Sequence, residues 1–224
     1  MPRTIIIGDI HGCLKSLNDL LEKIFTLATK TDTVLFLGDY VDRGPDAKGV
    51  LDRLIALKKE HSRLVTLKGN HDFLFLHYLK TQESDLFFQV GGLETLQSYG
   101  VQGQSASPIH DIPESHLHFL RELPLVFEDQ YGIYVHAGIQ AGRHLSMQSP
   151  KWCLWARESF LKTTFTLDKP IIFGHTVFQE PYVAQDKIGI DTGAVYGGLL
   201  TALILPDMKF IQVPGEQNSP YRND

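Results

Sequence analysis

Short apolar runs alternate with helical patterns in the first third of the chain. Continuous apolar segments at 4–7, 34–37 and 64–67 are typical of short buried strands. Between them, apolar residues recur at spacings of three and four over 13–28 and 47–60, which predicts amphipathic helices. A strand, helix and strand order of this kind predicts three parallel strands joined by two crossover helices.

The pattern changes after the third strand. Residues 73–123 are irregular and mostly helical, which predicts a helical insertion over the edge of the sheet. Short apolar runs then return with few helices between them, at 126–127, 131–135, 171–173, 188–190 and 199–205. These runs predict a second, mostly antiparallel sheet packed on the first. We expect one domain over 1–213 and a polar tail over 214–224.

Composition narrows the class of protein. A chain of 224 residues with net charge −5 and no cluster of Lys or Arg offers no footprint for nucleic acid. Because no apolar run approaches 18 residues, the sequence predicts neither a signal peptide nor a membrane span. Cys13 and Cys153 form no disulfide pattern, so we expect a cytoplasmic protein, and we expect a monomer.

The predicted strands end in the same kind of residue. The first three are each followed by glycine with Asp or Asn, and histidine stands beside that residue in two of them. Two later strands end in His136 and His175. Carboxyl ends of strands in open α/β sheets face the ligand crevice, so these side chains are expected in one site.

Carboxylate and imidazole together suit Mn, Fe or Zn better than Ca or plain Mg. We predict a pair of divalent ions with Asp39, central in the series, as the bridging carboxylate. One ion is assigned to Asp9, His11 and Asp39, and the other to Asp39, Asn70, His136 and His175. Two cations about 3.5–4 Å apart generate a hydroxide near neutral pH and clamp the oxygens of a displacement at phosphorus.

Three further residues complete the predicted chemistry. His71, next to Asn70, is assigned as the general acid for the leaving oxygen. Asp42 is expected to hold the ring of His71 and to raise its pKa. Arg43 is expected to bind phosphate through its two parallel N–H groups.

Five blocks carry a resemblance to a known family. They are residues 8–12 (GDIHG), 38–44 (GDYVDRG), 69–72 (GNHD), 136–138 (HAG) and 174–176 (GHT). In this order they resemble the signature blocks of the phosphoprotein phosphatase (PPP) group of calcineurin-like metallophosphoesterases, of the small bacterial serine/threonine type. The resemblance implies an α/β fold of two packed mixed β-sheets flanked by helices, a four-layer sandwich. It also implies a two-metal centre often filled by Mn and direct hydrolysis without a phosphoenzyme.

Other residues are assigned from weaker signals. The segment 154–160 resembles the part of bacterial members that carries a second phosphate-binding arginine, which makes Arg157 the candidate. The segment 191–198 resembles another bacterial block, with Tyr196 as a substrate contact. Cys13 could be a reactive thiol at a helix start, but we favour a buried helix residue. The remaining histidines are interpreted as surface or cap residues: His61, His77, His110, His116, His118 and His144.

Three functions are consistent with these residues. The favoured one is a phosphomonoesterase acting on phosphoserine and phosphothreonine in proteins or on small phosphoesters, with phosphotyrosine left open. The alternative is a symmetrical bis(5'-nucleosyl)-tetraphosphatase that produces two ADP. The third is a catalytically silent binding module. Symmetrical hydrolases usually carry a small apolar residue where this chain has Asp42, and an alkoxide leaving group needs an oriented acid, so Asp42 favours the first.

Overall fold

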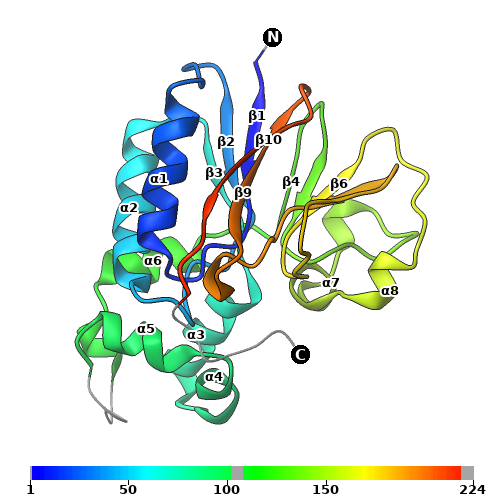
Figure 1. Ribbon diagram of the computed structural model, residues 1–224. Coiled ribbons are helices and arrows are strands. Elements are labelled where there is room, and N and C mark those ends of the chain that lie inside the picture. Colours follow the sequence, from blue (N-terminus) through cyan, green and yellow to red (C-terminus); the bar gives the residue numbers. More distant parts are fainter. Residues whose placement is uncertain (1, 102–107, 218–224) are drawn as a thin grey trace.

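The computed structural model describes residues 2–101 and 108–217 of the chain (Figure 1). The predicted parallel strands are present as β1 (Thr4–Ile7), β2 (Thr33–Phe36) and β3 (Leu64–Thr66). They are connected by α1 (Leu14–Phe25) and α2 (Ala47–Glu60). The Asp46 side chain accepts the N–H of Gly49 at 2.7 Å and so caps the start of α2.

The part of the chain that follows β3 is helical, as predicted. It contains α3 (Asn70–Thr81), α4 (Asp85–Gln89), α5 (Gly92–Ser98), the short 3₁₀ helix η1 (Pro108–Asp111) and α6 (Glu114–Arg121). Helices α5 and α6 pack against α2, so the insertion extends the helical layer beside the first sheet. Residues 100–108 are rich in Gly, Ser and Pro, which predicts turns, and most of this stretch lies outside the described residues.

The prediction of a mostly antiparallel second sheet is wrong in two respects, the direction of its strands and the strands that belong to it. Its strands run in the order β4-β5-β6-β8-β7, and β5/β6 and β6/β8 are parallel. These strands are β4 (Val126–Glu128), β5 (Ile133–Val135), β6 (Ile171–Phe173), β7 (Tyr182–Val183) and β8 (Lys187–Gly189). Strands β5 and β6 are parallel because a long connection through η2 (Leu145–Met147), α7 (Pro150–Trp155) and α8 (Glu158–Leu161) returns the chain to the same end.

The strand predicted at 199–205 belongs to the first sheet instead, and it pairs there with a last strand that the sequence analysis did not predict. Strand β9 (Leu199–Leu205) follows the short 3₁₀ helix η3 (Ala194–Tyr196) and pairs antiparallel with β1. Strand β10 (Lys209–Pro214) pairs with β9, giving the order β10-β9-β1-β2-β3. Both sheets are therefore mixed.

The two faces of the first sheet bury different cores. Ile5 and Ile7 of β1 pack with α1 and α2, whereas Ile6 packs with residues of the second sheet such as Tyr134. The outer face of the second sheet is covered by α7 and α8 around Phe160. Figure 1 shows the resulting four layers, with α1 and α2 on one side and α7 and α8 on the other.

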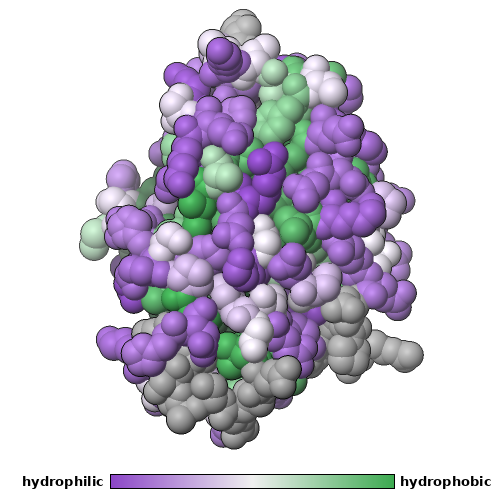
Figure 2. Space-filling view, turned by 90° about the vertical axis from the view of Figure 1, so that its left-hand side faces the viewer, coloured by the Kyte–Doolittle hydropathy of each residue, from purple (hydrophilic) through white to green (hydrophobic). Residues whose placement is uncertain are grey.

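The outer surface of the α1 and α2 layer faces the viewer in Figure 2. It is mostly hydrophilic, with small separate apolar patches, which is the pattern of an amphipathic helix layer in water. Within the described ranges, no helix has both the length and the apolar composition that crossing a bilayer requires.

Candidate metal centre

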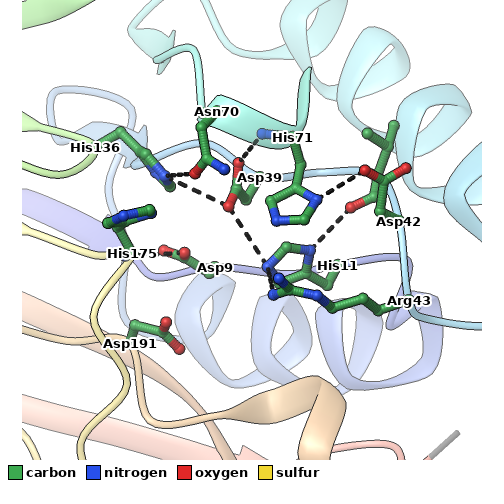
Figure 3. A network of polar contacts seen from close by, with 12 residues as sticks. Asp9, His11, Asp39, Asp42, Arg43, Asn70, His71, His136, His175 and Asp191 are labelled. Carbon is green, nitrogen blue, oxygen red and sulfur yellow. Dashed lines mark hydrogen bonds and ion pairs between the residues drawn. The ribbon is translucent and has the colours of Figure 1, made fainter. Parts of the chain in front are cut away.

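The predicted ligand residues meet where the strands end (Figure 3). Two groups of buried side chains place their ligand atoms within 4.8 Å of one another: His11, Asp39 and His71, and Asp39, His136 and His175. Asn70 joins the second group, because its Oδ1 lies 2.9 Å from Nε2 of His136. Asp39 is common to both groups, as expected of a bridging ligand, but the first group contains His71, predicted as the acid, in place of the predicted ligand Asp9.

The two oxygens of Asp39 face different partners. Oδ2 lies 3.5 Å from Nε2 of His11 and 3.4 Å from Nε2 of His136. Oδ1 accepts the backbone N–H of His71 at 2.9 Å. A carboxylate can bridge two ions with both of its oxygens, whereas this geometry places only Oδ2 of Asp39 between the two groups. Gly69 leaves the space that Oδ1 occupies, because a Cβ there would lie 2.0 Å from that oxygen.

Two histidines are oriented by the backbone. Nδ1 of His11 lies 2.9 Å from the carbonyl of Val41, and Nδ1 of His136 lies 3.1 Å from that of Leu37. With Nδ1–H donated to the carbonyl, the lone pair of Nε2 points toward Asp39, which is how second contacts commonly orient metal-binding histidines. Burial lowers the pKa of His136 to about 4, so its imidazole is neutral and able to bind a cation at physiological pH.

Asp9 provides a direct test of whether a cation fits. Its Oδ2 accepts the N–H of His175 at 2.9 Å, but its buried Oδ1 has no hydrogen-bond partner among the described residues. Burial, together with Asp191 and Asp39, raises the pKa of Asp9 well above its usual range. Burial likewise raises the pKa of Asp39 to about 8. A divalent cation would occupy the orphan oxygen and reverse both shifts, so the residues present fit a metal centre.

His71 and Asp42 form a buried pair. Nδ1 of His71 lies 2.7 Å from Oδ2 of Asp42, which leaves Nε2 for a substrate atom. The sequence analysis expected Asp42 to raise the pKa of His71. Instead the pKa of His71 is well below its usual range, first because of burial and then because of the positive charge of Arg43. A phosphate dianion would oppose the effect of Arg43 and shift the pKa of His71 upward.

The two candidate arginines lie on either side of the cluster. Nη1 of Arg43 is 3.1 Å from Nε2 of His11, and Nε of Arg157 is 3.2 Å from Nε2 of His175. The Arg43 guanidinium also lies over the ring of Tyr196, with Cζ 5.6 Å from the centroid. The structure thus brings Arg157 and Tyr196 to the site together with the five blocks.

Sequence reasoning assigned no role to three residues of this site. Asp72, in the third block, accepts the N–H groups of Asp39, Tyr40 and Gly69. Thr95 contacts Asp42 from helix α5. The third, Asp191, is buried, and its charge raises the pKa of Asp9. Asp72 and Asp191 lie inside quoted blocks, and Thr95 lies in a Gly-Gly-x-x-Thr-Leu motif at residues 91–96, but the sequence does not reveal its contact with Asp42.

Two interpretations of residues outside the blocks are also tested. Cys13 is fully buried, and burial raises the pKa of its thiol to about 12, which fits the favoured buried residue. The interpretation of His116 as a surface or cap residue is wrong. His116 is buried, with Nδ1 2.7 Å from the hydroxyl of Tyr99 and Nε2 3.0 Å from Asp52.

Two mixed sheets, a buried cluster of His, Asp and Asn at the strand ends and two arginines beside that cluster are the features expected of a metallophosphoesterase. The family model of calcineurin-like phosphoesterases matches residues 2–179, and the chain belongs to this family.

Comparison with individual proteins adds detail. The chain is 30% identical to a protein of Bacillus cereus (strain 03BB102) named bis(5'-nucleosyl)-tetraphosphatase PrpE [asymmetrical], over 93% of each chain. A crystal structure described as a putative diadenosine tetraphosphatase superposes with a TM-score of 0.75 at 26% identity, over 97% of each chain. A cold-active protein-tyrosine phosphatase of Shewanella shares the fold, with a TM-score of 0.72 at 17% identity, over 95% of this chain and 77% of the other.

Proposed function

We propose that this protein is a metal-dependent phosphomonoesterase that acts on phosphoserine and phosphothreonine in proteins or on small alkyl phosphates. The observation that carries the proposal is the 2.7 Å contact between the buried side chains of His71 and Asp42. An alkoxide leaves only when it is protonated, so this leaving group gains most from an oriented imidazolium.

The site residues have separate roles in the proposed hydrolysis. Two divalent cations, for which we propose Mn²⁺, would be held by Asp9, His11 and Asp39 and by Asp39, Asn70, His136 and His175, and they would supply the nucleophile and neutralise phosphate charge. Arg43 and Arg157 bind the non-bridging phosphate oxygens from opposite sides. His71 delivers a proton from Nε2 to the leaving oxygen, and Asp42 holds its ring. Tyr196 supports the Arg43 guanidinium from beneath.

A second candidate is hydrolysis of dinucleoside tetraphosphates. It is favoured by the name of the Bacillus cereus relative and by that of the crystal structure at 26% identity. The alternative predicted from the sequence is the symmetrical reaction, whereas the relative is named asymmetrical. If this activity belongs to the chain, its products would be ATP and AMP rather than two ADP. The Asp42 argument separates phosphomonoesterases from symmetrical hydrolases only.

The test is a comparison of kcat/KM for a phosphoserine peptide and for diadenosine tetraphosphate with the Mn-loaded protein, followed by chromatography of the nucleotides. We expect the peptide to be the better substrate. The Asp42→Asn variant is the matched control, because it should lose peptide hydrolysis by on the order of 10²-fold while changing the dinucleotide rate less. A higher kcat/KM for the dinucleotide would contradict the proposed function and favour the second candidate. Hydrolysis of neither substrate would contradict both.

A further inference from the structure

The backbone that carries Asp42 and Arg43 is strained. Both residues have positive φ, 70° and 69°, in the left-handed region that L side chains avoid. Such a conformation persists only when neighbouring groups hold it. Four of the contacts that hold it come from one segment of the helical insertion, residues 90–95, which comprises the link from α4 to α5 and the first residues of α5.

The first half of this segment holds Arg43. The carbonyl of Gly91 accepts the backbone N–H of Arg43 at 2.9 Å, and the carbonyl of Val90 accepts its side-chain Nε–H at 3.3 Å. Gly91 itself has φ of 101°, and a Cβ there would lie 2.6 Å from Cγ of Arg43. Only glycine allows this close approach.

The second half holds Asp42 through one hydroxyl. Thr95 Oγ1 accepts the N–H of Asp42 at 2.7 Å and donates to its Oδ1 at 2.7 Å. The other oxygen, Oδ2, contacts His71. Thr95 and Asp42 are both 0% exposed, so no bulk water can replace the hydroxyl. The two contacts of Thr95 therefore fix both the backbone and the rotation of the Asp42 carboxylate.

We infer that Thr95 is a positioning residue for proton transfer to the leaving group, acting on His71 through Asp42. The role rests on the proposed function in that it presumes His71 to be the acid. The segment 90–95 thus places the acid through Thr95 and the phosphate-binding arginine through Gly91. This gives the Gly-Gly-x-x-Thr sequence of the insertion a role in the chemistry.

The kinetic test uses Thr95→Val, which keeps the shape and removes the hydroxyl, and Thr95→Ser, which keeps the hydroxyl. For Thr95→Val we expect kcat on an alkyl phosphate to fall about 10-fold or more and kcat on an aryl phosphate to fall less than about 3-fold, because an aryl oxide needs little protonation. Thr95→Ser should restore the alkyl rate. Equal losses on both substrates, or no loss on either, would overturn the role.

Ser98→Ala is a matched control on the same helix. Ser98 Oγ accepts the N–H of Lys48 at 3.1 Å and donates to the carbonyl of Thr95, but it does not contact Asp42. The variant removes a hydroxyl that links α5 to α2 and should leave the alkyl to aryl ratio unchanged. A changed ratio in Ser98→Ala would attribute the effect to the packing of α5 and refute a specific role for Thr95.

A readout without turnover separates this inference from the proposed function. In Zn-loaded, diamagnetic protein, the Nδ1–H of His71 bonded to Asp42 should give a far-downfield proton resonance, assigned by its absence in His71→Asn. We expect Thr95→Val to shift or remove this resonance and Thr95→Ser to retain it. An unmoved resonance in Thr95→Val would contradict the inference. If the wild-type protein hydrolyses neither ester, the proposed function fails and the resonance alone decides the role of Thr95.

Discussion

Asp72 should contribute more to stability than any metal-ligand candidate, because it holds the loop that carries Asp39. Its Oδ2 accepts the N–H groups of Asp39 at 3.0 Å and Gly69 at 2.9 Å, and its Oδ1 accepts that of Tyr40 at 3.0 Å. The side chain is 0% exposed, so no solvent competes for these donors. We predict that Asp72→Asn destabilises the protein and that Asp72→Ala destabilises it more.

The magnitude follows from counting donors. Asn keeps one oxygen, which remains with the two donors of Asp39 and Gly69, and its NH₂ then faces the N–H of Tyr40. One buried donor without an acceptor costs about 1–3 kcal/mol, and the two retained bonds lose their charge assistance, so we expect roughly 2–4 kcal/mol for Asp72→Asn. Ala removes all three acceptors, and its cost should exceed that of Asn by about 1–3 kcal/mol.

Urea unfolding of the wild type and the variants measures the free energy of unfolding. The control is Asp19→Asn, which alters an exposed ion pair with Lys15 and should cost less than about 1 kcal/mol. If the free energy of unfolding of Asp72→Asn lay within about 0.5 kcal/mol of the wild-type value, the three hydrogen bonds would not be what stabilises the loop. A displaced Asp39 should also lower the metal content, which elemental analysis would detect.

Four other changes have defined outcomes. Asp39→Asn should abolish activity and reduce bound metal below two ions per chain by elemental analysis; most of the activity remaining would rule out bridging. Burial lowers the pKa of His116, so the unfolded state binds its proton first, and thermal stability should fall as pH drops from 7 through about 6.5. His116→Gln should make that fall smaller, and an unchanged pH profile would refute the link. Cys13, with its thiol pKa near 12, should not react with a thiol reagent at pH 8 until the protein is unfolded; a fast reaction in the native state would contradict its burial. The free energy of unfolding of Arg43→Gly, measured in urea, should exceed that of Arg43→Ala by about 1 kcal/mol, because glycine relieves the strain of the positive φ. Equal free energies of unfolding would mean that the strain is absent.

The three parallel strands of the first sheet, and the polar blocks at their ends, were predictable from the sequence. Strands buried on both faces read as continuous apolar runs, and β1 carries three isoleucines in four residues. Each run stops at a glycine where a polar block begins, so the strand ends were visible in the sequence. Parallel order then brought Asp9, Asp39 and Asn70 to one edge without knowledge of any contact.

The second sheet was harder to predict for a physical reason. A run buried on both faces, such as 199–205, carries no alternation that tells which sheet it joins. Its pairing with β1 is set by contacts almost two hundred residues apart, such as Ile7 opposite Ala202. Strand β7 has only two residues, too few for any periodic signal.

Polar contacts inside the insertion were equally hidden. His116 lies on a short helix with acidic and apolar neighbours, and its burial depends on Tyr99 and on Asp52 of α2. Thr95 lies 53 residues from Asp42 in the chain. A hydroxyl or imidazole at such a position looks like a solvent-facing residue until the fold supplies its partner.

Backbone strain explains why the loop conformations of the site, unlike its residues, could not be predicted from local sequence. Among the described residues, seven other than glycine have positive φ, and five of them belong to the site: His11, Asp39, Asp42, Arg43 and His175. Local propensity opposes these conformations, so contacts from elsewhere in the fold must hold them. Asp72 holds Asp39, Thr95 holds Asp42, and the Asp9 carboxylate accepts the N–H of His175. The residues that hold the strained backbone should therefore tolerate substitution as poorly as the predicted ligands do.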